Sequence, residues 1–126
     1  MAAIYGDVIV DRFRHPRRRG SLDRPHASHE DVNPLCGDRI RMEVRLAEGR
    51  PTVAAVRFQG DACAIAVASA DLLAEMAEGR SPADVARIDR PALVAALQAT
   101  IRPSRLQCVG LPLYVLQGAL NELPAR

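Results

Sequence analysis

The stretch Arg39-Ile40-Arg41-Met42-Glu43-Val44-Arg45-Leu46 decides the fold that we predict, because its charged and apolar residues alternate strictly. This period of two is typical of a half-buried antiparallel β-strand, with one face in the core and the other in solvent. Residues 53–59 repeat the pattern after a turn at 48–51, with Ala54, Val56 and Phe58 predicted to face inward. The two segments therefore predict a β-hairpin.

Metal-ligating residue types flank both ends of this hairpin. Cys36 and Asp38 stand just before the first strand, and Cys63 follows the second. Because an antiparallel hairpin returns the chain to its starting point, we expect these residues to lie close together. A thiolate and a carboxylate in one small volume repel each other unless a cation lies between them, which favours a metal. The alternative is a plain turn, in which Asp38 bonds to the backbone and Cys36 is a small apolar residue.

The remaining cysteines also lie at predicted element boundaries. Residues 64–78 form an alanine-rich helical pattern that stops at Gly79, so Cys63 falls at a helix N-terminus, where the dipole favours a thiolate. A buried, inert cysteine is the alternative there. A last helix is expected from about Val109 to Leu123, with Cys108 just before it and Pro112 in its first turn. Small residues beside each cysteine leave room for a ligand.

The pattern of the remaining residues predicts helices and one long loop. We expect a helix over residues 2–14, a polar loop from Pro16 to Pro34, and two short helices that begin after Ser81 and Asp89. The run Arg17–Arg19 is interpreted as solvated loop rather than a partner-binding patch. His26 and His29, in the same loop, are left outside the metal site.

Composition indicates one domain, residues 1–126, with an aliphatic core, since hydrophobic residues make up 48% but include only two Phe, two Tyr and no Trp. A net charge of +2 and scattered arginines predict no nucleic-acid partner and no membrane partner. Without a long apolar run or a signal-peptide pattern, we expect a cytoplasmic protein. Three cysteines, an odd number, argue against a disulfide framework in such a compartment.

With these motifs in view, the chain resembles the U-type iron–sulfur cluster assembly family, which contains IscU, SufU and the N-terminal domain of NifU. The likeness covers nearly the whole chain and rests on Cys36-Gly37-Asp38-Arg39-Ile40, Cys63-Ala64-Ile65-Ala66-Val67-Ala68-Ser69 and Arg105-Leu106-Gln107-Cys108. The resemblance implies an α+β fold in which a small antiparallel sheet packs against a layer of helices. It also implies that Cys36, Asp38, Cys63 and Cys108 bind a metal or cluster.

Two departures separate the chain from IscU-like members. Gln107 stands where they carry a histidine, and Ile101-Arg102-Pro103-Ser104-Arg105 replaces their chaperone-recognised Leu-Pro-Pro-Val-Lys segment. The residues around Cys36 and Cys108 are closer to SufU-like members, although the longer insertion of that branch between the second and third cysteines is absent. The sequence therefore indicates a compact, SufU-like member.

The resemblance implies two functions. In the first, the chain is a scaffold that holds a nascent [2Fe–2S] cluster, receives sulfur from a cysteine desulfurase of the SufS or IscS type, and passes the cluster to apo iron–sulfur acceptor proteins. Thiolates suit such a cluster, and one carboxylate makes it easier to release. In the second, the chain is a zinc-dependent sulfurtransferase without a cluster, since Zn²⁺ readily takes tetrahedral coordination by three thiolates and a carboxylate.

A third reading, a purely structural zinc domain, is disfavoured by the Asp ligand and by the small residues around the cysteines. In both the scaffold hypothesis and the sulfurtransferase hypothesis, one cysteine accepts sulfur. Cys36 is the predicted acceptor because it lies on a loop, and the SufU-like branch favours the first cysteine. Cys108 is the second choice, and Cys63 is the least mobile of the three.

Overall fold

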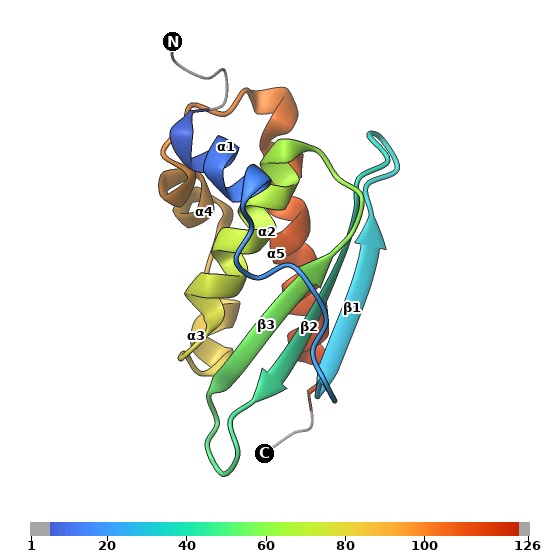
Figure 1. The fold of residues 1–126 in the computed structure, drawn as a ribbon, viewed down its shortest axis with the longest axis vertical. Helices are drawn as coiled ribbons and strands as arrows, with labels where there is room; N and C mark the ends of the chain where they lie inside the picture. The colour runs from blue at the N-terminus through green and yellow to red at the C-terminus, as the bar shows by residue number, and fades with distance from the viewer. Residues whose placement is uncertain (1–5, 124–126) are drawn as a thin grey trace.

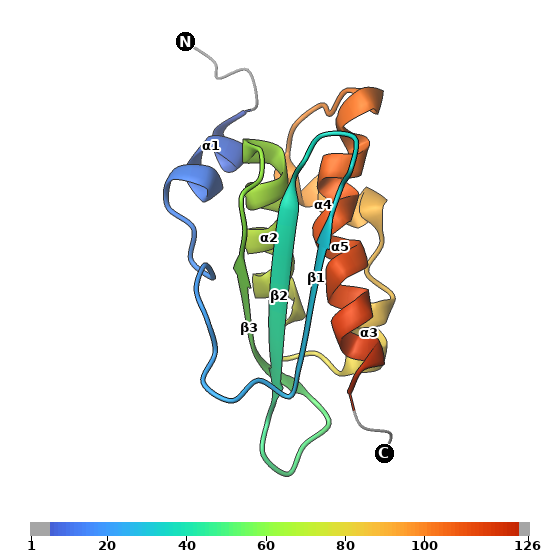
Figure 2. The same ribbon diagram turned by 90° about the vertical axis from the view of Figure 1, so that its right-hand side faces the viewer.

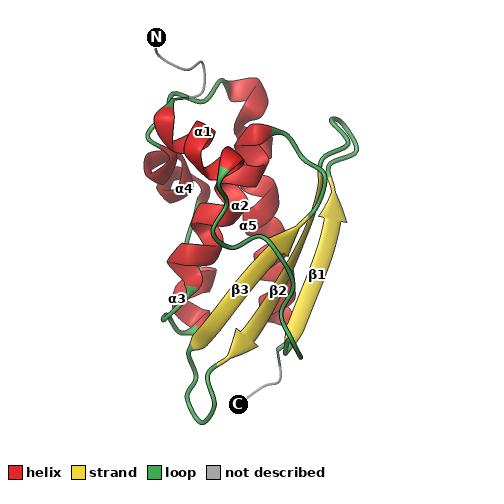
Figure 3. Cartoon of the chain, viewed as in Figure 1, coloured by secondary structure: helices red, strands yellow, loops and turns green. Residues whose placement is uncertain are grey.

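The computed structural model describes residues 6–123, which form a three-stranded antiparallel sheet in the order β1-β2-β3 with helices packed on one face (Figure 1, Figure 3). The elements are α1 (Asp7–Arg14), β1 (Ala27–Val32), β2 (Arg39–Leu46), β3 (Val53–Gln59), α2 (Ala64–Ala77), α3 (Pro82–Ala86), α4 (Arg90–Leu97), a 3₁₀ turn (Pro103–Arg105) and α5 (Leu106–Asn121). The predicted α+β fold is confirmed. Within the described range, none of the helices combines the length and apolar character that crossing a bilayer requires.

The predicted hairpin is present as β2 and β3. Met42 stands opposite Phe58 and Val44 opposite Val56, and these four side chains are buried. A register shift between Arg45 and Leu46 then pairs Leu46 with Val53. Because this irregularity changes which side chains face the core, Val53 is buried and Ala54 is exposed. The prediction that Ala54 faces inward was wrong.

Strand β1 lies within the segment that we predicted as loop. Its residues Ala27–Val32 pair with β2 along their whole length, from Ala27 opposite Val44 to Val32 opposite Arg39. The sequence Ala-Ser-His-Glu-Asp-Val has little β-propensity, so only the tertiary context makes it a strand. Helix α5 supplies part of that context, because a Cβ on Gly118 would lie 2.7 Å from the ring of His29. Gly118 thus makes room for His29, which is partly buried rather than solvated.

The core lies between the sheet and helices α2 and α5, seen from the side in Figure 2. It is aliphatic, as the composition predicted, with Phe58 as the one aromatic residue buried in the described chain. The caps of the short helices are also confirmed. Ser81 accepts a hydrogen bond from Asp84 N at 3.1 Å, and Asp89 accepts one from Ala92 N at 3.0 Å.

The buried side chain of Asp71 fixes the N-terminal part of the chain to α2. Asp71 is fully buried and accepts hydrogen bonds from the backbone N–H groups of Arg17 (2.8 Å) and Arg18 (2.7 Å) and from Arg12 Nη1 (2.9 Å). Arg18 also donates to Glu78. The segment Arg17–Arg19, predicted as solvated loop, is therefore tied down through its backbone. Of the helix predicted over residues 2–14, residues 2–5 lie outside the described range.

Helix α5 begins at Leu106, before the predicted Val109, and ends at Asn121. Cys108 consequently lies inside its first turn rather than ahead of it. Pro112 falls beyond that first turn, where it removes the intrahelical hydrogen bond to the carbonyl of Cys108 because proline has no N–H. Ser69 Oγ of α2 donates to Val109 O at 2.8 Å and holds this part of α5 against α2.

Candidate metal centre

The four predicted ligands converge at the end of the sheet where β2 begins and β3 ends. Cys36 Sγ, a carboxylate oxygen of Asp38 and Cys108 Sγ lie within 4.8 Å of one another. Cys63 stands next to them at the N-terminus of α2, where its backbone N–H donates to Asp38 Oδ1 at 3.0 Å and its thiol helps to raise the pKa of Cys108. Its sulfur is not one of the three ligand atoms that are grouped within 4.8 Å. The turn before β2 and the N-termini of α2 and α5 thus bring the three cysteines and Asp38 to the same end of the sheet, with the thiols of Cys36 and Cys108 and the Asp38 carboxylate in one small group.

A closed turn presents Cys36 and Asp38. Asn33 O accepts from Gly37 N at 2.7 Å, and Asn33 N donates to Asp38 O at 2.8 Å. Asn33 Oδ1 also accepts from Leu35 N at 3.0 Å. Gly37 adopts a φ of +77°, which favours glycine, so the glycine between the two candidate ligands allows the turn to close tightly.

Gly60 is a site-forming residue that sequence reasoning missed. Its φ is +143°, and a Cβ built on it would lie 2.0 Å from the carbonyl oxygen of Arg39. This close approach, together with the hydrogen bond from Arg39 N to Asp61 O at 2.9 Å, brings the chain leading to Cys63 against the start of β2. The available signal was a glycine directly after a strand and just before a candidate ligand.

Exposure differs sharply among the four residues. Cys36 is exposed, Cys63 is partly buried, and Cys108 is 1% exposed. Asp38 is 7% exposed. The site is therefore open to solvent on the side of Cys36 and closed on the side of Cys108.

Asp38 provides the test of whether a metal fits. It does bond to backbone, as the plain-turn alternative expected, but only through Oδ1. Among the residues that the structure describes, Asp38 Oδ2 is the one buried side-chain oxygen or nitrogen without a hydrogen-bond partner. Leaving a buried carboxylate uncompensated is costly, and a cation beside the thiols would satisfy it. Three thiolates and one carboxylate oxygen are a donor set that suits Zn²⁺ or iron, so the residues fit such a metal.

The raised pKa of Cys108 also indicates that a cation would be stabilising at this site. Its burial, reinforced by the neighbouring Cys63 thiol, raises the pKa of Cys108 to about 12. Arg105 Nη1, 4.0 Å from the Cys108 sulfur, acts in the opposite direction. The buried sulfur therefore stays a protonated thiol until a stronger positive charge arrives. Arg105 was quoted in the sequence motif without a role, although a cation three residues before a helical cysteine can reach it.

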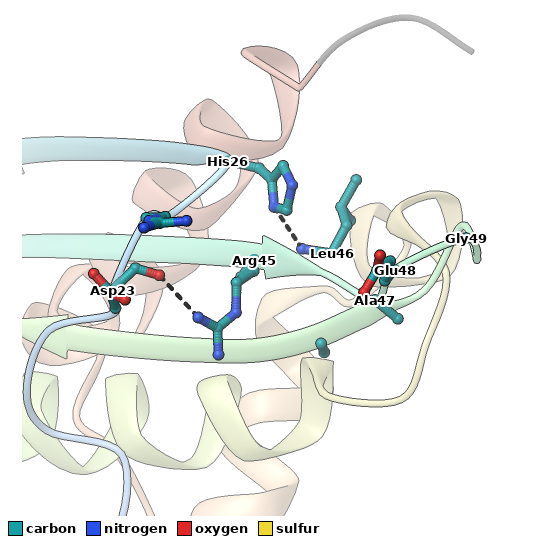
Figure 4. Close-up of a pocket in the computed structure, with 9 residues that line it drawn as sticks. Asp23, His26, Arg45, Leu46, Ala47, Glu48 and Gly49 are labelled. Atoms are coloured by element: carbon teal, nitrogen blue, oxygen red, sulfur yellow. Dashed lines mark hydrogen bonds between the residues drawn. The ribbon is translucent and has the colours of Figure 1, made fainter.

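Neither His26 nor His29 belongs to the group of ligand atoms found in the described residues. His26 lies at the opposite end of the sheet, where its Nδ1 accepts a hydrogen bond from Leu46 N at 3.0 Å (Figure 4). The hollow drawn there also contains Arg45, whose guanidinium donates to the carbonyl of Asp23. His29 packs beside α5.

A small antiparallel sheet, a single helical layer and a cluster of three cysteines and an aspartate at one end define a compact α+β domain with a candidate metal site. Residues 4–126 match the family model described as NifU-like N terminal domain, and the chain belongs to that family. The resemblance inferred from the sequence is confirmed.

Three of the curated relatives to which the chain is similar have different names. The chain is 31% identical over 122 residues to the bifunctional protein NifU/MnmA of Rubrobacter xylanophilus, covering 97% of this chain but only 25% of that relative. It is 27% identical over 119 residues to the iron-sulfur cluster assembly scaffold protein IscU 1 of Archaeoglobus fulgidus (94% of this chain, 76% of the relative). It is 35% identical over 77 residues to the zinc-dependent sulfurtransferase SufU of Bacillus subtilis (61% and 50%). The chain thus spans about a quarter of the length of the first of these relatives.

Solved structures support the fold. A putative iron-sulfur cluster assembly scaffold protein for the SUF system from Fervidobacterium Islandicum AW-1 superimposes with a TM-score of 0.78 at 23% identity, covering 93% of this chain and 96% of that one. An N-terminal NifU-like protein from Brucella abortus gives a TM-score of 0.76 at 19% identity, covering 95% and 94%.

Proposed function

We propose that this chain is an iron–sulfur cluster assembly protein that holds a metal ion or a nascent [2Fe–2S] cluster through Cys36, Asp38, Cys63 and Cys108. The observation that carries the proposal is the buried, unpartnered Oδ2 of Asp38, whose carboxylate is grouped with the thiols of Cys36 and Cys108 and accepts the backbone N–H of Cys63. The cluster is the cargo of such a protein. A carboxylate is a harder and weaker ligand for it than a fourth thiolate, which suits a protein that must release what it binds.

Sulfur would come from a cysteine desulfurase. Cys36 is the proposed acceptor because, of the three cysteines, it has the exposed thiol. In this step the Cys36 thiolate attacks the outer sulfur of the desulfurase persulfide. The sulfur–sulfur bond of the donor breaks, its electron pair leaves on the donor cysteine, and Cys36 becomes the persulfide. Apo iron–sulfur proteins are the proposed recipients. Such thiol chemistry suits a reducing compartment, and we place it in the cytoplasm.

A zinc-dependent sulfurtransferase is the second candidate. It is favoured by the 35% identity to the Bacillus subtilis protein of that name over 77 residues, and by Gln107, an amide where a histidine ligand would otherwise precede Cys108. In this version Zn²⁺ is held by the same four residues, sulfur still arrives on Cys36, and the chain acts as an enzyme that carries no cluster.

Metal analysis of protein isolated without added metal distinguishes the two candidates. One zinc per chain that resists exchange by iron supports the sulfurtransferase. A visible-absorbing cluster that forms with desulfurase, cysteine and iron, and that moves to an apo-ferredoxin, supports the scaffold. Asp38→Ala should lower the content of either metal, whereas the control Asp61→Ala, an exposed carboxylate nearby, should not. Equal metal content in both variants would contradict the proposed site.

Persulfide mapping tests the acceptor. After incubation with desulfurase and cysteine, mass spectrometry without reductant should find the added sulfur on Cys36, and Cys36→Ser should abolish it. Sulfur on Cys63 alone would contradict both the assignment and the exposure argument behind it.

A further inference from the structure

The turn that presents Cys36, which joins β1 to β2 in Figure 1, carries the most exposed large apolar side chain of the described residues. Leu35 is 83% exposed, and the next in order is Tyr114 at 62%. Leu35 belongs neither to the core nor to the residues packed against it. The turn at the other end of β2, residues 47–52, reads Ala-Glu-Gly-Arg-Pro-Thr and contains no large apolar residue. The fold therefore does not require a leucine beside Cys36.

Asn33 holds the backbone of this turn in place. Its Oδ1 accepts a hydrogen bond from Leu35 N at 3.0 Å, and its carbonyl oxygen accepts from Cys36 N at 3.3 Å and from Gly37 N at 2.7 Å. Three consecutive N–H groups thus bond to one residue, and Pro34 before them has a fixed φ. Because the exposed leucine is carried on ordered backbone, its burial against a partner costs little further ordering of the chain.

The position of Leu35 decides which partner can bury it. Leu35 and Cys36 are neighbours, so their Cα atoms lie about 3.8 Å apart, and both residues are exposed. A donor sulfur must approach Cys36 Sγ to about 3–3.5 Å before it can be transferred. When that sulfur is carried on a protein, the protein surface around it meets Leu35 in the same approach. A small sulfur donor can reach Cys36 and leave Leu35 in water.

The apolar character of Leu35, rather than charge, distinguishes this surface. The charged residues that flank the turn outside the candidate metal site are Asp31 and Arg39, which have opposite signs. Burial of a leucine side chain is favourable, and Leu35 has most of its surface still to bury. A partner that meets this turn therefore gains most if it offers an apolar socket.

We propose that Leu35 is the anchor by which this chain docks on its sulfur donor, a cysteine desulfurase with an apolar socket beside the cysteine that carries the persulfide. The inference rests on the proposed function, because it takes Cys36 as the sulfur acceptor. Leu35 is a positioning residue. Its burial places Cys36 Sγ next to the donor sulfur, and its side chain takes no part in the attack of the thiolate.

Initial rates of Cys36 persulfuration test the anchor, when they are measured against the concentration of the chain with a SufS-type desulfurase and cysteine. Leu35→Asn keeps a branched side chain of similar shape but makes it polar, so KM should rise about tenfold with kcat unchanged. Leu35→Met stays apolar, and its KM should remain within about threefold of that of the parent. Phe13→Asn makes the same kind of change at a 44% exposed residue of α1, and this matched control should leave KM unchanged.

Two further measurements separate docking from chemistry. Inorganic tetrasulfide gives sulfur to Cys36 when the thiolate attacks its terminal sulfur and trisulfide leaves, and the rate should be equal in the parent and in Leu35→Asn. The affinity for a desulfurase whose catalytic cysteine is replaced by serine should fall about tenfold in Leu35→Asn, although no sulfur can be transferred. Melting temperature and metal content verify that each variant folds.

The docking proposal is overturned if Leu35→Asn binds the desulfurase and accepts its sulfur as the parent does. It is also overturned if tetrasulfide reacts more slowly with Leu35→Asn by the same factor, if only cluster transfer to an apo-ferredoxin is slowed, or if the parent does not bind the desulfurase. A parent that self-associates through Leu35 in light scattering overturns it as well. A parent that binds the desulfurase but takes no sulfur on Cys36 contradicts the proposed function instead, and the affinities then decide the role of Leu35.

Discussion

The two aspartates buried among the described residues of this domain stand in opposite situations. Asp71 is fully buried, and both of its oxygens accept hydrogen bonds, one of them from the cation Arg12. Asp38 is nearly as buried, but one oxygen has a single backbone donor and the other has no partner. Arg12 thus compensates the charge of Asp71 within the fold, whereas we propose that a bound cation compensates the charge of Asp38. By this proposal Asp71 stabilises the fold and Asp38 is a ligand.

The largest expected effect lies on the Asp71 side. Asp71→Ala leaves Arg12 and two backbone N–H groups without their acceptor, so we expect a loss of about 3–5 kcal/mol in the free energy of unfolding. Because Asp71 lies outside the proposed metal site, the loss should be the same with zinc and with chelator in denaturant titrations. Glu75→Ala removes a more exposed partner of Arg12 and should cost about 0–1 kcal/mol. If Asp71→Ala lowers the free energy of unfolding with zinc but not with chelator, the contrast between Asp71 and Asp38 is wrong.

Removing a thiol should affect stability only through the metal. In Cys63→Ser and Cys108→Ser we expect weaker zinc binding, and hence a loss of about 2.7 kcal/mol where the parent is measured at a free zinc concentration of 100 times its Kd. With chelator present the variants should lie much closer to the parent. Thermal melts at matched zinc concentrations measure this difference. Full zinc content and unchanged melting in both variants would remove the cysteines from the site.

Gly60→Ala should disturb the site through the backbone. A Cβ there meets the Arg39 carbonyl, and the φ of +143° strains any other residue, so we expect a loss of about 1–3 kcal/mol together with weaker zinc binding. Gly49→Ala is the control, since Gly49 also has positive φ (+70°) but a Cβ there meets nothing within 4 Å and it lies at the other end of the sheet. It should lose some stability and keep its zinc affinity. Equal zinc affinity in both variants would show that the close approach at Gly60 does not position Cys63.

The smallest effect concerns pH. The pKa of Cys108 is raised to about 12 in the metal-free fold, against about 8.5 for an unfolded thiol. Between these values the unfolded chain has lost a proton that the folded chain still binds, so the stability of the metal-free protein should fall as pH rises above about 8.5. Denaturant titrations at pH 8 and pH 10 with chelator measure this, and the fall should shrink in Cys108→Ala. With zinc bound the dependence reverses at low pH, because protons compete with the metal for the ligands.

Strict alternation predicted the hairpin, and the hairpin predicted that Cys36, Asp38 and Cys63 lie close together, but alternation did not predict the register shift that leaves Ala54 exposed. The full set of four ligand candidates came from the resemblance to the family. Prediction from the sequence failed where tertiary contacts override the local pattern. Strand β1 is polar and is held by β2 and by the space at Gly118, neither of which shows in residues 27–32. The partners of Asp71 are mostly backbone N–H groups, which every sequence contains, so its role could not be predicted from residue types.

The most direct test of the central claim is the stability of Asp38→Asn with and without zinc. The amide keeps an oxygen for Cys63 N but removes the uncompensated charge. With chelator the variant should therefore be as stable as the parent or more stable, and with zinc the parent should gain far more stability than the variant. Asp61→Asn, measured alongside, should follow the parent in both conditions. If Asp38→Asn instead loses the same stability with zinc and with chelator, Asp38 is a turn residue and the account of a metal-completed site is contradicted.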